Sequence, residues 1–210
     1  MIAQQNNEQP IDKLVFELSK LPGIGEKTAS RLAYFIIKQD SSYSKSLAES
    51  ILLSKKNIQF CQQCFHLTDV NPCRICNLNN RKTGSICVVE QPSDVLAIEK
   101  SQLHYGVYHV LHGVLSPLDG IGPEDLKIKE LLNRLNTKTD QKNSFHEVIL
   151  AMNPSVEGEA TALYLARLIQ PCRIKVTKIA HGLPAGGLLE FSDRQTIGKA
   201  FENRAEIKSL

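Results

Sequence analysis

The sequence predicts a multidomain α+β protein with a helical N-terminal region, a small cysteine-rich metal site, an α/β region and a short C-terminal tail. Three observations support this prediction. Apolar residues recur at helical spacing in the first part of the chain. Four cysteines then fall within sixteen residues. After them, short β-branched runs alternate with helical stretches, which indicates a mostly parallel sheet with helices on both faces.

Length and composition exclude several classes of protein. A chain of 210 residues holds one large domain or a few small ones. Its 42% hydrophobic and 22% charged residues exclude a disordered chain. No apolar run reaches the roughly 18–20 residues that a membrane-spanning helix needs, and the polar start MIAQQNNEQP lacks a secretory signal. We therefore expect a soluble, cytoplasmic protein that does not bind membranes.

The charge is unevenly distributed along the chain. The net charge is only +3, but residues 1–82 hold 11 Lys and Arg against 7 Asp and Glu. The excess of basic residues at this end is a weak indication that it binds a polyanion.

Three helices are expected in the N-terminal region, at 11–19, 26–38 and 43–57. Each has apolar residues that share one helical face, and we expect these faces to pack into a core. The residues are Ile11, Leu14, Val15 and Leu18 in the first helix, Ala29, Leu32, Ala33, Ile36 and Ile37 in the second, and Leu47, Ile51 and Leu52 in the third.

The first two helices are separated by the segment LPGIG, which contains Gly23 and Gly25. A helix that starts directly after glycines exposes unpaired backbone N–H groups at the positive end of its dipole, which suits an anion. Lys27 and Arg31 lie four residues apart and can contact the same strand of phosphates. The alternative is an ordinary turn beside a solvated basic face. The four residues form a candidate DNA-binding site.

The cysteine cluster has the spacing Cys61-x2-Cys64-x8-Cys73-x2-Cys76. Two C-x2-C pairs supply four soft ligands for one tetrahedral zinc ion, and the closed shell makes this ion structural. Four free buried thiols are improbable at this spacing. A redox pair is disfavoured because the two pairs lie close together and neither is expected to open a helix.

Three further residues of types that can ligate a metal are not expected to do so. His66 lies between the cysteine pairs, but the four thiolates already fill the zinc shell, so we expect it at the surface. Cys87 and Cys172 stand alone and are expected to be buried as small apolar residues.

The α/β region is expected to alternate strands with helices, and a loop that begins HGLPAGG and a short helix follow it. The expected strands are 85–90, 107–111, 147–152 and 173–180, and the expected helices are 92–100, 124–135 and 157–169.

Polar residues follow the first and third expected strands. In a parallel sheet, groups at the carboxyl ends of neighbouring strands converge on one crevice. Glu90 is either a solvated carboxylate at a strand end or part of a weak, vestigial metal site. The residues at this edge are Glu90, Asn153, Ser155, Glu157 and Gly158.

Two of these motifs resemble known domains. LPGIG, followed by Ala29 and Leu32, resembles the helix-hairpin-helix of DNA repair proteins. The strand-end pattern resembles the Toprim domain of topoisomerases, primases and small nucleases, in which a Glu and an Asp-x-Asp-x-x-Gly hold Mg²⁺. Here Asn153 and Ser155 replace both aspartates. Because Mg²⁺ favours charged carboxylate oxygens, we expect this site to bind it poorly.

The order of these parts is similar to that of the bacterial recombination mediator family RecR. Four segments of the chain also resemble hallmark segments of that family, namely VVEQPSDVLAIE, LHGVLSPLDGIGP, NPSVEGEATALYLARLI and HGLPAGG. The resemblance covers nearly the whole chain. It implies four domains, namely a helix-hairpin-helix at 1–58, a zinc finger at 59–80, a Toprim domain at 84–180 and a C-terminal loop and helix at 181–210.

The resemblance also implies a function. Members of this family form rings or open clamps around DNA, and they act with RecO and RecF to load RecA onto single-stranded DNA in gaps. The chain is then a non-enzymatic DNA clamp associated with the nucleoid, with one structural zinc. Its partners are single- and double-stranded DNA of any sequence, RecO, RecF and further copies, in a tetrameric ring or a dimer of dimers.

Residue roles follow from the same resemblance. Lys27 and Arg31 correspond to the DNA-binding residues of the family, and Glu90 and the 153–158 turn belong to the face implicated in binding RecO. The alternative function is that of a metal-dependent Toprim enzyme, a nuclease or primase-like protein. A weaker third alternative is a scaffold that binds only proteins.

Overall fold

A computed structural model of the chain describes residues 9–81, 84–136 and 145–206. It divides the chain into two compact units, Met1–Ile58 and Gln59–Leu210, which are treated separately below. The first eight residues, on which the expected lack of a secretory signal rests, and the last four residues of the tail lie outside the described residues. The four domain ranges inferred from the resemblance stay predictions.

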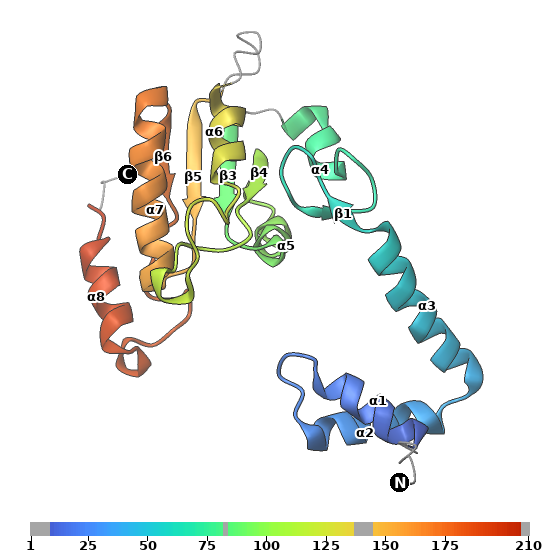
Figure 1. Cartoon of the computed structure of the whole chain (residues 1–210). Helices are drawn as coiled ribbons and strands as arrows, with labels where there is room; N and C mark the ends of the chain where they lie inside the picture. The colour runs from blue at the N-terminus through green and yellow to red at the C-terminus, as the bar shows by residue number, and fades with distance from the viewer. Residues whose placement is uncertain (1–8, 82–83, 137–144, 207–210) are drawn as a thin grey trace. The chain divides into compact units, whose positions relative to one another are not determined.

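The first unit contains three helices, α1 (Pro10–Ser19), α2 (Glu26–Lys38) and α3 (Ser41–Asn57) (Figure 1). All three were predicted from apolar periodicity. Proline occupies the first position of α1, where its missing N–H costs no hydrogen bond. The Asp40 side chain caps α3 by accepting a hydrogen bond from the backbone N–H of Tyr43, which explains why this helix starts at Ser41.

The expectation that one face of α3 packs into a core is wrong for the single chain. Ile51 and Leu52 are 62% and 69% exposed, and Leu47 is exposed as well. On α2 the expectation is also wrong for Leu32 and Ile37, which are exposed. The buried residues of the described helices in this unit are Ala29 and Ala33, both on α2. Periodicity identifies residues that share a face of a helix, but it does not show whether the same chain covers that face.

The second unit begins with the cysteine-rich segment. It forms a two-stranded antiparallel hairpin, β1 (Gln59–Phe60) and β2 (Leu67–Thr68), and a single helical turn, α4 (Arg74–Asn77). We call residues 59–77 the zinc module. The expectation that neither cysteine pair opens a helix is wrong for the second pair, because Cys73 caps α4. The 3₁₀ turn η1 (Asn79–Arg81) follows the zinc module.

A four-stranded parallel sheet forms the centre of the second unit, as predicted. The strand order is β4-β3-β5-β6, so the chain adds β4 on one side of β3 and then crosses to the other side. This reversal places a topological switch point between the carboxyl ends of β3 and β5. The strands are β3 (Ser85–Val89), β4 (Val107–Val110), β5 (Glu147–Ala151) and β6 (Lys175–Lys178).

Helices cover both faces of this sheet. They are α5 (Pro92–Ser101), α6 (Ile128–Asn136) and α7 (Val156–Ile169). The start of α6 is four residues later than the predicted position 124. The segment before α6 makes non-helical hydrogen bonds instead. The N–H of Gly122 donates to the carboxylate of Asp125, and the N–H of Lys127 donates to the carbonyl of Leu111.

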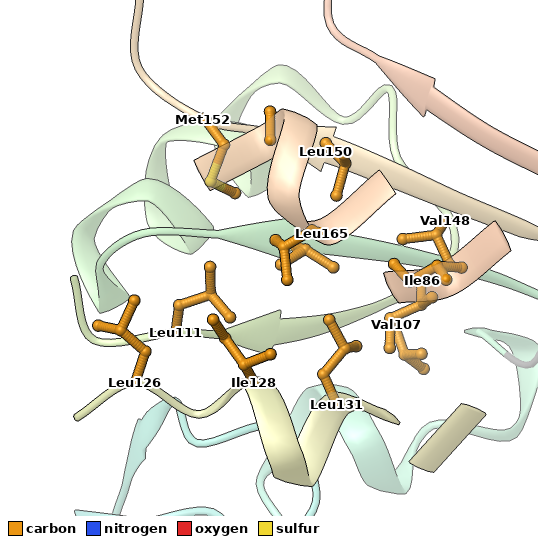
Figure 2. Packing of buried hydrophobic residues seen from close by; sticks show 13 residues of the cluster. Ile86, Val107, Leu111, Leu126, Ile128, Leu131, Val148, Leu150, Met152 and Leu165 are labelled. Atoms are coloured by element: carbon orange, nitrogen blue, oxygen red, sulfur yellow. The ribbon is translucent and has the colours of Figure 1, made fainter. Parts of the chain in front are cut away.

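Alternate residues of each strand enter two different cores, as the period of a strand requires. The larger core joins one face of the sheet to α6 and α7, and Figure 2 shows Leu131 of α6 and Leu165 of α7 close to the strand residues. The second core lies on the opposite face, where α5 and the zinc module pack. Its buried members are Cys87, Val89, Val95, Tyr108, Val110 and Ala151.

The tail contains η5 (Leu189–Phe191) and α8 (Arg194–Glu202), which is the short terminal helix that the sequence predicted. The carboxylate of Asp193 caps α8 by accepting hydrogen bonds from two backbone amides. Phe191 and Phe201 are exposed. Among the helices of the described ranges, none combines the length and the apolar character needed to cross a membrane.

Candidate nucleic-acid interface, metal centre and degenerate Toprim site

The turn between α1 and α2 has the geometry of an anion site. Gly23 has φ +78°, a conformation that glycine adopts without strain, and Ile24 N–H closes the turn on the carbonyl of Leu21. Gly25 is the N-cap of α2, and no side chain caps this helix. A Cβ added at either glycine would meet no atom within 4 Å, so the approach to the start of α2 is open. The first-turn amides can therefore receive a phosphate oxygen.

Lys27 and Arg31 are exposed on the first turns of α2. At 100° per residue they lie on the opposite side of the helix from the buried Ala29 and Ala33. The structure thus brings the two basic side chains and the glycine turn to one end of the same helix. Such a group can bind the sugar–phosphate backbone without contacting base edges. Its role in DNA binding stays a prediction.

The four cysteines of the zinc module are brought together and buried. Their sulfur atoms all lie within 4.8 Å of one another. Backbone amides stabilise thiolates there, because Cys73 N–H donates to the Cys61 sulfur at 3.3 Å and Cys76 N–H donates to the Cys73 sulfur at 3.4 Å. Four convergent soft ligands fit a tetrahedral Zn²⁺.

The ionisation of these thiols shows why they need a cation. Hydrogen bonds from Cys64 and then from Cys76 lower the pKa of Cys73. The same contacts act in the opposite direction on Cys64, whose pKa is raised by its hydrogen bonds with Cys73 and Cys76. One thiolate is thus favoured only while its neighbours keep their protons. A Zn²⁺ ion among them would let all four sulfurs be thiolates at once, and the convergence of the four buried sulfurs supports one structural zinc per chain.

The expectations for His66, Cys87 and Cys172 have different outcomes. His66 is half-buried rather than at the surface, and burial lowers its pKa. Among the described residues its Nδ1 has no hydrogen-bond partner. Cys87 is buried as expected, and burial raises its pKa to about 12. The expectation for Cys172 is wrong, because it is only partly buried, with its sulfur 3.4 Å from the side-chain oxygen of Asn136.

Glu90 and Asn153 meet at the switch point of the sheet. Glu90 directly follows β3 and is only 8% exposed. The backbone N–H of Asn153 donates to Oε1 of Glu90 at 2.6 Å, and its side-chain Nδ2 donates to Oε2 at 2.7 Å. These two bonds satisfy both carboxylate oxygens. The interpretation of Glu90 as a solvated carboxylate is therefore wrong.

Ser155 and Gly158 support this clamp. The hydroxyl of Ser155 accepts a hydrogen bond from Gly158 N–H at 3.0 Å and so caps α7. A Cβ at position 158 would collide with the backbone oxygen of Asn153 and lie 3.0 Å from Oε1 of Glu90. Glycine is therefore required for the close approach of α7 to the clamp. Ser155 acts as a helix cap in the position where the Toprim pattern has a metal ligand.

The remaining acidic residues near the turn have other surroundings. In the described part of the chain, the one group of three or more histidine, cysteine or acidic side chains close enough to share an ion is the cysteine cluster. Glu157 is half-buried at the start of α7. Glu159 pairs instead with Lys178 at 2.9 Å, and this contact lowers the pKa of Glu159.

Two functional features were missed from the sequence. Glu159 also contacts Nδ1 of His181 at 3.2 Å, and Asn203 of the tail donates to the carbonyl of His181, so this histidine attaches the tail to α7. The histidine in HGLPAGG was the available signal. The amide of Asn153 as a donor to Glu90 was also missed, because it depends on the parallel register of β3 and β5.

Comparison with known protein families finds four matches in chain order. Residues 11–53 match the RecR helix-hairpin-helix, and residues 58–77 match the RecR four-cysteine zinc finger domain. Residues 84–180 match the Toprim domain, and residues 182–205 match the RecR C-terminal region. The four matches leave only short gaps between residues 11 and 205.

Proposed function

Because the chain belongs to the RecR family of recombination repair proteins, we propose that it is a DNA-binding clamp and adaptor that catalyses no reaction. In this proposal it acts with RecO and RecF to help load RecA at single-stranded gaps, and it resides on the nucleoid. The observation that carries the non-enzymatic part is the clamp of Asn153 on both oxygens of Glu90.

The clamp argues against metal chemistry for an electrostatic reason. Mg²⁺ needs anionic oxygens in a near-ideal octahedron. In the Toprim pattern an aspartate at position 153 would add a second negative charge beside Glu90, and a cation would bind between them. The neutral side chain of Asn153 instead donates a hydrogen bond to Oε2 of Glu90, beside the backbone N–H bond to Oε1, so the carboxylate is stabilised without a cation.

The DNA-binding part rests on the α1–α2 turn and the basic residues beside it. One hairpin offers two basic side chains and a few amides, which is a small contact with DNA. Several hairpins around a common channel multiply the affinity through effective concentration. We therefore include self-assembly in the proposal, as a tetrameric ring or a dimer of dimers.

Exposed apolar side chains support self-assembly. Contiguous exposed apolar surface on a helical unit is typical of a protein–protein interface. In the first unit the exposed apolar residues are Phe16, Leu21, Leu32, Tyr34, Phe35, Ile37, Tyr43, Leu47, Ile51, Leu52, Leu53 and Ile58. In the tail they are Leu183, Leu188, Leu189, Phe191 and Phe201.

For RecO we propose the face that contains Glu90 and the 153–158 turn. The turn beside the clamp is accessible, and its residue Val156 is 82% exposed. An exposed apolar side chain next to a rigid, hydrogen-bonded clamp suits a docking surface. The clamp then has a shaping role, since it fixes the turn that the partner contacts.

A cleavage assay tests the proposal against the enzyme alternative. Supercoiled plasmid and single-stranded DNA are incubated with the full chain in Mg²⁺ and in Mn²⁺, beside Glu90→Ala. We expect no cleavage by either protein. Cleavage by the unchanged chain that is lost in Glu90→Ala would establish the enzyme instead. Salt-dependent DNA binding by the same samples separates a DNA clamp from a scaffold that binds only proteins.

A further inference from the structure

Strand β4 lies at one edge of the parallel sheet, with β3 as its neighbour. Edge strands present backbone N–H and C=O groups that can pair with another chain. The amide of Leu111, just past β4, bonds to Val89 on β3. Because the backbone groups of a strand alternate in direction, Tyr108 and Val110 present theirs on the outer side.

Both of these outward residues are capped by other parts of the second unit. Val110 N–H donates to the carbonyl of Cys64 at 2.8 Å, and Arg134 of α6 donates to the carbonyl of Tyr108 at 2.6 Å. The cap on Val110 belongs to the zinc module. Because Cys64 is a zinc ligand through its sulfur, the same residue binds the metal and caps the strand edge.

A second set of contacts fixes this cap. His112, which follows β4, donates from Nε2 to the carbonyl of Phe65 at 2.8 Å. The ring of Phe60 lies against the ring of His112, with 4.5 Å between centroids. Phe65 has φ +62°, a conformation that side-chain-bearing residues rarely adopt and that the fold must hold in place. Its ring packs edge-on against His109 in β4, at 5.4 Å between centroids.

The rest of the sheet has its own support. The larger core between the sheet, α6 and α7 contains no residue of the zinc module. The second core has Phe65 and Ile75 of the module only at its margin, as partly buried neighbours. Loss of the module therefore removes the cover of one edge and leaves the packing between β3, β5 and β6 in place. Such local opening is an ordinary behaviour of folded domains.

We propose that the zinc module is a metal-dependent cover of the β4 edge. With zinc bound, the carbonyl of Cys64 is held against Val110 and the edge is closed. When zinc leaves, the 61–76 segment loses the bonds that order it, because metal binding and folding are coupled in such sites. The edge then opens while the sheet persists. This inference does not depend on the proposed role in recombination.

Hydrogen exchange measured by mass spectrometry tests the proposal on the full chain. The zinc-loaded protein is compared with protein stripped by a chelator under reducing conditions, and zinc is then restored. We expect exchange in the peptide that contains Val110 to rise about tenfold or more on stripping and to return with zinc, since one protecting hydrogen bond is worth about that factor. Peptides from β3 and β5 should not change.

Two variants sharpen the test. Cys64→Ser keeps the backbone carbonyl but removes a zinc ligand, so it should reproduce the stripped state at Val110. Cys172→Ser is the matched control, because Cys172 lies outside the cluster, and it should leave exchange at Val110 unchanged.

Two results would overturn the proposal. One is an unchanged Val110 peptide in stripped wild-type protein, which would show that zinc does not control the edge. The other is an equal rise in β3 and β5, which would show that zinc supports the whole domain. The stripping arm uses the wild-type chain and so stands even if Cys64→Ser fails to fold.

Discussion

Arg81 forms a two-pronged ion pair with Glu99, with Nη1–Oε1 and Nη2–Oε2 distances of 2.7 and 2.6 Å. The hydroxyl of Tyr108 donates to the same Oε1 at 2.6 Å. The pair therefore connects the turn after the zinc module to α5 and to β4. Both charged side chains are largely shielded from water.

This ion pair makes stability depend on pH. Burial raises the pKa of Glu99, but the hydrogen bonds from Arg81 and Tyr108 outweigh it, so the pKa lies below the ordinary 4.5. A lowered pKa contributes stability that is present above about pH 4.5 and is lost as pH falls through the folded value. We expect Arg81→Met to lower the free energy of unfolding at pH 7 by about 1–3 kcal/mol. Urea denaturation at pH 7 and pH 3.5 checks this, and the difference between variant and wild type should shrink at pH 3.5.

Zinc content is the next test. We expect one zinc per chain, and Cys61→Ser should lower both the zinc content and the thermal midpoint, because three thiolates no longer close the tetrahedral shell. Elemental analysis and calorimetry on fresh protein measure the two quantities. Cys172→Ser should leave the zinc content unchanged. Less than half an equivalent of tightly bound metal in the wild type would contradict the assignment.

Restoring acidic residues at the switch point should restore affinity for a divalent cation. Asn153→Asp with Ser155→Asp places two carboxylates near Glu90, so calorimetric titration should detect tighter Mg²⁺ binding than in the wild type. Asn153→Asp alone should lower the thermal midpoint in a chelating buffer, with recovery in Mg²⁺, since two close carboxylates repel each other. Equal Mg²⁺ affinity in the double variant and the wild type would show that the backbone there cannot form a metal site.

DNA binding is tested by reversing charge on α2. Lys27→Glu with Arg31→Glu should nearly abolish binding, because both exposed residues lie beside the open start of the helix. Wild-type binding should not depend on base sequence, and it should fall with salt with a log–log slope of about 0.7–0.9 per phosphate contact. Lys100→Glu with Lys129→Glu, at two exposed positions outside the first unit, is the control with the same change in charge. If the α2 variant keeps its affinity and salt slope, the DNA surface lies elsewhere.

Self-assembly is tested on the exposed face of α3. Ile51→Lys with Leu52→Lys should shift the chain to smaller species in sedimentation at tens of micromolar protein, because these side chains leave water only when a partner covers them. Leu103→Lys, at an exposed apolar position outside the first unit, is the control. A wild-type chain that is strictly monomeric with and without DNA would refute assembly.

The sequence predicted the features that depend on local pattern. Apolar periodicity identified the three helices of the first unit, and short β-branched runs identified the four strands of the sheet. Cysteine spacing identified the zinc ligands for the same local reason. The short elements of the zinc module were not predicted, because metal ligation and docking on β4 specify them.

Contacts between distant segments were beyond the reach of the sequence. The partner of Glu90 depends on β3 and β5 lying side by side, although 63 positions separate Glu90 from Asn153. Ile51 is exposed because no other helix of the described chain covers it.

The clamp of Asn153 on Glu90 also limits how this sequence can change over generations. A single mutation to aspartate at position 153 keeps the backbone N–H bond to Oε1 of Glu90, but it exchanges the side-chain amide bond to Oε2 for a repulsive pair beside a buried carboxylate. Position 155 must change as well before the full ligand pattern returns, and there an aspartate carboxylate can replace the Ser155 hydroxyl as the cap of α7. The cost of the full ligand pattern therefore lies at position 153, where a second negative charge would meet the buried carboxylate of Glu90.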